Sequence, residues 1–131
     1  MKTIHKFLQD NQTFYLATID GDQPRVRPFG AVCLFEEKLY ICTNNQKAVY
    51  RQMKANPKIE ISAAAQNGSW LRLSAKAIAD DNPAARQAML DAVPSIQGMY
   101  KADDGIFEVL YLKNATGLIC DFDGKAEKHE F

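Results

Sequence analysis

The segment from residue 14 to residue 43 reads FYLATIDGDQPRVRPFGAVCLFEEKLYICT. Its first part is rich in aromatic and β-branched side chains that alternate between two faces, which predicts a strand over 13–20. Asp20-Gly21-Asp22 is a hairpin turn signal, so a second strand is expected over 23–35. The segment therefore predicts that the fold begins with antiparallel strands.

Pro28 and Gly30 interrupt the second of these strands. A proline removes one donor from a β-ladder, so this stretch is expected to be a sheet edge, a bulge or a break. Glu36-Glu37-Lys38 then turns the chain into a third strand over 39–43.

The rest of the chain continues mainly in hairpins. Further strands are expected at 58–65, 70–79, 106–113 and 115–122, the last two as a closing pair around Asn114. Short helices are expected at 3–11, 46–55 and 83–93, with one more helical turn at 95–101. The strand–helix–strand rhythm of a parallel sheet is missing. The pattern favours a mainly β, antiparallel fold with about three short peripheral helices, and a closed or nearly closed barrel would remove its edges.

Length and composition fit one domain over residues 1–131. Its core is expected at 3–122, and the charged tail at 123–131 is expected to be loose. Apolar residues make up 47% and charged residues 24%, which excludes a disordered chain. No apolar run approaches the roughly 20 residues that span a bilayer, and the first ten residues lack the apolar core of a secretory signal. These features predict a cytoplasmic protein without a membrane partner.

The formal net charge is zero, which argues against nucleic acid as the main partner. The charges are nevertheless unevenly distributed. Residues 1–79 hold eleven Lys/Arg and six Asp/Glu, whereas residues 80–131 hold five and ten. An anionic small ligand would prefer the first part, although chance clustering explains the asymmetry equally well.

Three cysteines, Cys33, Cys42 and Cys120, are too few and too scattered for a disulfide framework. Cys33 and Cys42 could face each other across a hairpin, and reduced, buried thiols are the expected state in the cytosol. The two histidines, His5 and His129, lie near the termini and no Cys-x-x-Cys exists, so no metal site is expected.

The stretch Arg25-Val26-Arg27-Pro28-Phe29-Gly30 is the first candidate for ligand binding. Arg25 and Arg27 lie two residues apart on a strand, so their side chains share a face. Pro28 and Gly30 free backbone groups from the sheet, and such groups can hydrogen-bond a planar heterocycle at the strand edge. By spacing alone, a bulged edge strand with two solvated arginines explains these residues better.

The stretch Thr43-Asn44-Asn45-Gln46-Lys47 is the second candidate, at the end of a strand and the start of a helix. The first N–H groups of a helix lack internal partners and form a natural phosphate seat. Thr43 and Asn44 add donors, Lys47 adds a charge in the first turn, and Arg51 lies one turn later on the same face. A cation at a helix N-terminus is unfavourable, and a phosphate would remove that conflict. An asparagine cap with exposed charges is the alternative interpretation.

Trp70 and Arg72 share a strand face. Trp70 could pack against an aromatic cofactor or a dimer partner, or simply in the core. The sequence contains no Gly-x-Gly-x-x-Gly, no P-loop and no Gly-x-Ser-x-Gly, and no carboxylate pair stands out as an acid/base couple. Any catalysis would therefore depend on the reactivity of a bound cofactor, and no catalytic side chain is assigned.

Together these motifs resemble the pyridoxamine 5′-phosphate oxidase-like family, and most closely its small bacterial members of the nitroimidazole-resistance type. The resemblance covers about residues 3 to 122 and depends on the order and spacing of several segments. These are Phe14-Tyr15-Leu16-Ala17-Thr18, Pro24 to Gly30, Leu39-Tyr40-Ile41-Cys42-Thr43 with Lys47 and Asn56-Pro57, and Trp70-Leu71-Arg72-Leu73.

The resemblance implies a split β-barrel, a homodimer and two FMN sites at the dimer interface. It implies that the strand from Arg25 to Gly30 runs along the isoalloxazine ring, and that Thr43 to Lys47, with Arg27 or Arg51, holds the phosphate. Trp70 and Arg72 would lie near the ring or the partner chain. The expected function is an FMN-dependent oxidoreductase that takes electrons from NADH or NADPH and passes them to a small acceptor.

The C-terminal end, from Asp121 to Phe131, is acidic on balance, whereas the true oxidases carry a basic substrate-binding segment there. Oxidation of pyridoxamine phosphate is therefore not expected. Two alternatives stay open: a non-catalytic FMN-binding carrier, sensor or stress protein, and a haem- or pyridoxal phosphate-binding protein on the same fold.

Overall fold

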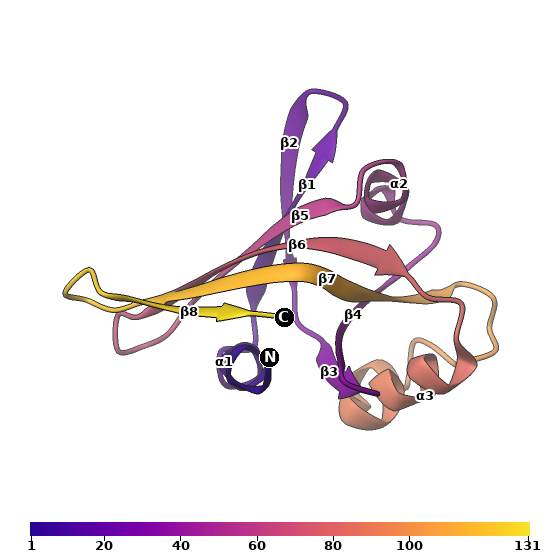
Figure 1. Cartoon of the computed structure of the whole chain (residues 1–131). Helices are drawn as coiled ribbons and strands as arrows, with labels where there is room; N and C mark the ends of the chain where they lie inside the picture. The colour runs from indigo at the N-terminus through magenta and orange to yellow at the C-terminus, as the bar shows by residue number, and fades with distance from the viewer.

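An antiparallel sheet of eight strands forms the body of the molecule in the computed structural model, which describes residues 1–131 (Figure 1). The strands are β1 (Phe14–Asp20), β2 (Gln23–Phe29), β3 (Val32–Phe35), β4 (Lys38–Asn44), β5 (Lys58–Ala64), β6 (Trp70–Ala79), β7 (Phe107–Cys120) and β8 (Ala126–Glu130). Seven of them follow the order β2-β1-β5-β6-β7-β4-β3, and β8 pairs with β7. All pairings are antiparallel, as expected from the hairpin pattern.

The two end strands of this order, β2 and β3, are neighbours in sequence, separated only by Gly30 and Ala31. The sheet must therefore curl until its ends approach each other, which gives a barrel that is split between β2 and β3. Pro28 lies opposite Tyr15 on the end strand β2, where a missing N–H breaks no interior ladder. The predicted split barrel is confirmed. Of the outcomes expected for the Pro28–Gly30 stretch, the structure shows an end strand at Pro28, which stays paired, and a break at Gly30 and Ala31.

Three α-helices and one 3₁₀ turn surround the sheet: α1 (Lys2–Asp10), α2 (Ala48–Ala55), α3 (Pro83–Ala92) and η1 (Pro94–Ile96). In Figure 1, α2 lies near the start of β5, and α3 lies beside β3 and β4 on the opposite side of the sheet. Pro83 occupies the first turn of α3, and the Asn82 side chain accepts hydrogen bonds from the Ala84 and Ala85 N–H groups. None of these helices is long and apolar enough to cross a membrane.

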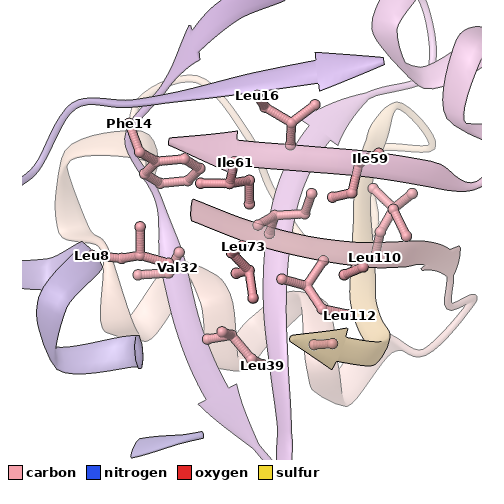
Figure 2. Packing of buried hydrophobic residues seen from close by; sticks show 14 of the residues in the cluster. Leu8, Phe14, Leu16, Val32, Leu39, Ile59, Ile61, Leu73, Leu110 and Leu112 are labelled. Atoms are coloured by element: carbon pink, nitrogen blue, oxygen red, sulfur yellow. The ribbon is translucent and has the colours of Figure 1, made fainter. Parts of the chain in front are cut away.

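A row of aligned side chains forms the centre of the core (Figure 2). Leu16, Ile61 and Leu73 lie opposite one another on β1, β5 and β6, and all three are fully buried. The row ends on β7 at Gly117, where an added Cβ would lie 2.6 Å from Cδ1 of Ile4. Glycine at this position therefore lets α1 pack directly against the sheet.

The structure corrects the expected hairpin around Asn114. Residues 107–120 form one continuous strand, β7, which pairs with β6 on both sides of Asn114. Asn114 has a φ of +52°, and the register with β6 shifts between Ser74 and Lys76. The left-handed residue thus makes a β-bulge that bends the strand without reversing it.

The expectation of a loose tail was also wrong for most of its residues. Residues 126–130 form β8, which pairs with the second half of β7. A turn at Asp121–Gly124, with Gly124 at a φ of +83°, brings the chain back. The pairing arises because β4 borders only the first half of β7, from Phe107 to Tyr111, and leaves the edge of the second half free.

Candidate functional site

A cavity of about 330 Å³ opens beside the break between β2 and β3. Its volume lies at the lower end of the range of about 300–1,000 Å³ typical of small-molecule sites. Eight of its fourteen lining residues are hydrophobic. The lining residues are Arg27, Pro28, Phe29, Gly30, Ala31, Cys42, Thr43, Lys47, Val49, Val93, Ser95, Ile96, Met99 and Tyr100.

Arg27 supplies a positive charge to this cavity and is held only by neutral groups. Its Nη1 donates to Oγ1 of Thr18 at 2.7 Å and to the Leu16 carbonyl at 3.2 Å, and its Nη2 donates to Oε1 of Gln52 at 2.7 Å. No carboxylate forms an ion pair with Arg27. Burial, and then the charge of Arg25, lower the pKa of Arg27. An anion in the cavity would compensate this charge.

Lys47 and the N-terminus of α2 lie on the same cavity. Lys47 is the N-cap residue, and no side chain caps the first N–H groups of the helix. These groups therefore lack a protein partner and can receive an acceptor. Lys47 also forms no ion pair, so two unpaired cations and a helix N-terminus converge on one opening.

The helix begins at Ala48 and not at Gln46 as expected, so Lys47 precedes the first turn instead of lying within it. The reason is local: Oδ1 of Asn44 accepts from the Gln46 N–H at 3.0 Å, and this turn delays the helix. The side chain of Lys47 still reaches the cavity from its position before the helix.

The buried polar side chains gather around this cationic region. Thr18, 2% exposed, and Thr43, 6% exposed, are the polar side chains in the buried set. Thr18 contacts Arg27, and Thr43 lines the cavity. Burying a polar group is costly unless it is hydrogen-bonded. The position of both threonines beside Arg27 and the cavity therefore suits the binding of a polar ligand group there.

The other wall of the cavity is apolar and comes from the segment after α3. It includes Val93, Ile96 and Met99, and Met99 is 65% exposed although it lines the cavity. Tyr100 stacks on Phe107 with ring centroids 5.0 Å apart, and its hydroxyl accepts a hydrogen bond from Nδ2 of Asn44 at 2.7 Å. The sequence prediction missed this wall, although the spacing of Ile96, Met99 and Tyr100 after Pro94 was an available signal.

The structure brings half of the predicted site residues together. Those that line the cavity are Arg27, Pro28, Phe29, Gly30, Thr43 and Lys47. Arg25 and Arg51 do not line the cavity: Arg25 pairs with Asp20 at 3.2 Å, and Nη1 of Arg51 donates to the Gln46 carbonyl at 3.1 Å. Asn45 bonds the Gly105 carbonyl and the Glu108 carboxylate. Asn44 does not line the cavity, but its Nδ2 donates to the hydroxyl of Tyr100, which does.

Trp70 and Arg72 lie elsewhere, on the outer face of β6. The Arg72 guanidinium lies 5.1 Å from the Trp70 ring, a cation–π arrangement. Both residues line a separate shallow groove together with Tyr15, Val26 and Glu60. Within one chain they therefore take no part in the cavity at Arg27.

The family model described as pyridoxamine 5′-phosphate oxidase matches residues 1–116 of this chain. The chain belongs to this family. The resemblance inferred from the sequence is thus confirmed. No curated protein matches the chain.

Solved structures agree with the family assignment. A NimC/NimA family protein from Clostridium acetobutylicum is 49% identical to this chain, with a TM-score of 0.97. The match covers 100% of this chain and 92% of that protein. Two more distant structures share the fold: a haem-binding protein from Mycobacterium smegmatis and a pyridoxamine 5′-phosphate oxidase-related, FMN-binding protein from Nostoc punctiforme. They are 18% and 15% identical, with TM-scores of 0.77 and 0.67. The match to the haem-binding protein covers 95% of this chain and 55% of that protein. The match to the FMN-binding protein covers 99% of this chain and 95% of that protein.

The cavity of this family member contains no carboxylate and no histidine among its lining residues. Its one thiol is Cys42, whose pKa is raised to about 12, mainly by burial and also by Cys33. The lining can therefore bind and orient an anionic, partly apolar molecule, and it contains no carboxylate or histidine that could act as a general acid or base.

Alkylation of Cys42 by iodoacetamide is expected to be much slower than that of glutathione at neutral pH, because only the thiolate reacts and burial keeps the Cys42 thiol protonated. Since the raised pKa keeps the thiol protonated, the rate should increase about tenfold for each pH unit of increase. Mass spectrometry of the Cys42 peptide in the folded protein, with glutathione in the same sample, measures both rates. A pH-independent rate close to that of glutathione would contradict this account of the thiol.

Proposed function

We propose that the cavity binds FMN, with the phosphate between Arg27, Lys47 and the N-terminus of α2. The observation that carries this proposal is the pair of cations without carboxylate partners at a helix N-terminus that no side chain caps. A dianionic phosphate would compensate both charges and accept from the free N–H groups at once. The distant relative named as FMN-binding supports the same ligand.

The flat ring of the ligand would extend from this corner along Pro28 to Gly30, opposite the apolar wall. Gly30 lies in the break between β2 and β3, so its backbone is outside both strands. Phe29, Ile96 and Tyr100 provide apolar surface on the cavity lining. Ligand sites of this type combine such surface with a few polar groups that fix the orientation.

The proposed activity is that of an FMN-dependent oxidoreductase. FMN held here would supply two-electron redox chemistry between NADH or NADPH and a small acceptor such as a quinone or a nitro compound. The residues of this chain would anchor the phosphate, orient the ring and leave one opening, beside Met99, for the acceptor.

Stopped-flow spectroscopy of the FMN-loaded protein tests this activity. Addition of NADH or NADPH should bleach the visible flavin absorbance, and a quinone should restore it. If neither nicotinamide bleaches the flavin, the oxidoreductase proposal fails and the non-catalytic FMN-binding protein takes its place.

Pyridoxal phosphate offers the same phosphate group, so it is the competing ligand for this corner. A larger rise in the melting temperature with pyridoxal phosphate than with FMN would favour it. Haem is less suitable, because no histidine lines the cavity that could bind its iron.

We also propose a homodimer formed through the outer face of β1, β2, β5 and β6. This face exposes Tyr15 by 51%, Ile19 by 37% and Val26 by 68%, and several exposed apolar side chains on one sheet face favour burial against a partner. Glu60 and Arg72 lie on the same face, so a two-fold arrangement could pair opposite charges. Trp70 and Arg72 would then reach the partner, where they could complete its FMN site.

Val26→Lys is expected to weaken the dimer by about a hundredfold in Kd, because a two-fold interface buries the new charge twice. Light scattering coupled to size-exclusion chromatography over a dilution series measures the change. Ala84→Lys, on the exposed surface of α3, is the matched control and should leave the dimer intact. An unchanged dimer in Val26→Lys would place the interface elsewhere.

A cytoplasmic location and a single domain over residues 1–131 complete the proposal. All three cysteines are free thiols, a state that a reducing compartment maintains.

A further inference from the structure

We propose that Thr18 and Gln52 are positioning residues that hold the Arg27 guanidinium in the orientation that receives the phosphate. This inference rests on the proposed FMN site and adds to it two residues that do not line the cavity themselves.

The three side chains form a closed triangle of hydrogen bonds. Arg27 donates to Thr18 Oγ1 and to Gln52 Oε1, each at 2.7 Å, and the Thr18 hydroxyl donates to the same Gln52 oxygen at 2.6 Å. A guanidinium has no acceptor, so the Gln52 atom that faces it must be the carbonyl oxygen. Arg27 therefore only donates, the Gln52 oxygen only accepts, and the Thr18 hydroxyl accepts from Arg27 and donates to Gln52.

The triangle is built on buried or partly buried groups from three elements. Thr18 comes from β1 and is 2% exposed, Arg27 comes from β2, and Gln52 comes from α2. An arginine side chain loses considerable rotamer freedom when it is fixed. Because this triangle fixes Arg27 during folding, phosphate binding need not order the side chain again.

The neutrality of both partners is the feature that distinguishes a binding site from a structural ion pair. A carboxylate at position 52 would restrain Arg27 equally well but would cancel its charge. An amide and a hydroxyl restrain the guanidinium and leave its full positive charge available to an anion. Of the four other arginines, Arg25 and Arg86 pair with carboxylates. Arg51 bonds a backbone carbonyl, and Arg72 lies over the Trp70 ring on the outer face.

Helix α2 connects this triangle with the second cation. Lys47 is its N-cap residue, and Gln52 follows five positions later on the same helix. Arg27 is therefore anchored, through Gln52, to the same helix that carries Lys47 at its N-terminus. A phosphate that binds both cations would contact two groups supported by one element.

The test compares FMN with riboflavin, which has the same ring but no phosphate. Kd values for both ligands are measured by fluorescence quenching in the wild type and in Gln52→Met, Gln52→Glu and Thr18→Val. FMN affinity should fall about tenfold in Gln52→Met and Thr18→Val, which lose one acceptor, and about a hundredfold in Gln52→Glu. Riboflavin affinity should stay within about twofold in all three.

Gln87→Glu is the matched control, since Gln87 is exposed on α3 and bonds only Asp91. It should change neither Kd. Equal losses for FMN and riboflavin in the Gln52 and Thr18 variants, or no loss for either, would overturn the positioning role. Wild-type protein that binds FMN no better than riboflavin would instead overturn the phosphate site itself, and the positioning role with it. Thermal unfolding of each variant confirms that the compared proteins are folded.

Discussion

Replacing Lys47 with glutamate is expected to weaken FMN binding by about a hundredfold or more, because a carboxylate would face the phosphate in place of an ammonium group. The substitution changes the charge at the N-cap of α2, where the first N–H groups have no side-chain cap. Riboflavin, which carries no phosphate, should lose little affinity. Titration of the purified protein with each ligand measures both effects.

Lys54→Glu is the matched control for this substitution. Lys54 lies in the last turn of the same helix and is exposed, so the variant has the same net charge without a carboxylate at the cavity. Its FMN affinity should stay within a factor of about three. A similar loss of FMN affinity in both variants would show that the net charge of the protein controls binding, and not a phosphate site at Lys47.

Leu73→Ala is expected to reduce the free energy of unfolding by about 3 kcal/mol, within the range seen when a buried leucine is truncated. Leu73 is fully buried on β6, between Ile61 of β5 and Gly117 of β7 (Figure 2). Its neighbours lie on sheet strands that cannot collapse far into the space left behind. Urea denaturation followed by circular dichroism measures the change.

Ser74→Ala provides the comparison on the same strand. Ser74 is exposed, and its hydroxyl bonds only the Glu60 carboxylate at 2.8 Å. Its truncation should change the free energy of unfolding by no more than about 0.5 kcal/mol. If Leu73→Ala were equally mild, the row of aligned side chains would not be the centre of the core.

Sequence patterns could predict the parts of this fold that depend on neighbouring residues. The turn at Asp20-Gly21-Asp22 follows from the left-handed backbone that Gly21 adopts, with a φ of +65°. Pro28, which cannot donate to a ladder, fits the position of β2 at an end of the sheet, where it stays paired with Tyr15. The break itself falls at Gly30 and Ala31.

Features that depend on distant partners could not be predicted in the same way. Asn114 resembles a turn residue, and only the pairing of β7 with β6 on both sides shows that it makes a bulge. The charged sequence of β8 has little intrinsic strand preference, and it pairs because the edge of β7 is free.

The candidate site also combines features set by neighbouring residues with features set by distant partners. Arg27 and Lys47 were predicted because their residue types and local positions suit an anion. Arg25 was predicted for the same reasons, yet it pairs with Asp20, a partner that a hairpin register brings close. Spacing alone does not show which of two arginines on one strand face finds a carboxylate. The apolar wall from Val93 to Tyr100 was missed because it approaches the cavity only through the path of the chain after α3.

A crystal structure of the protein with FMN tests the central claim most directly. We expect the phosphate within hydrogen-bonding distance of the Arg27 guanidinium and the Lys47 ammonium group, with the ring beside Pro28 to Gly30. A ligand bound elsewhere, or a corner that stays empty at saturating FMN, would contradict the proposed function and leave only the family and the fold.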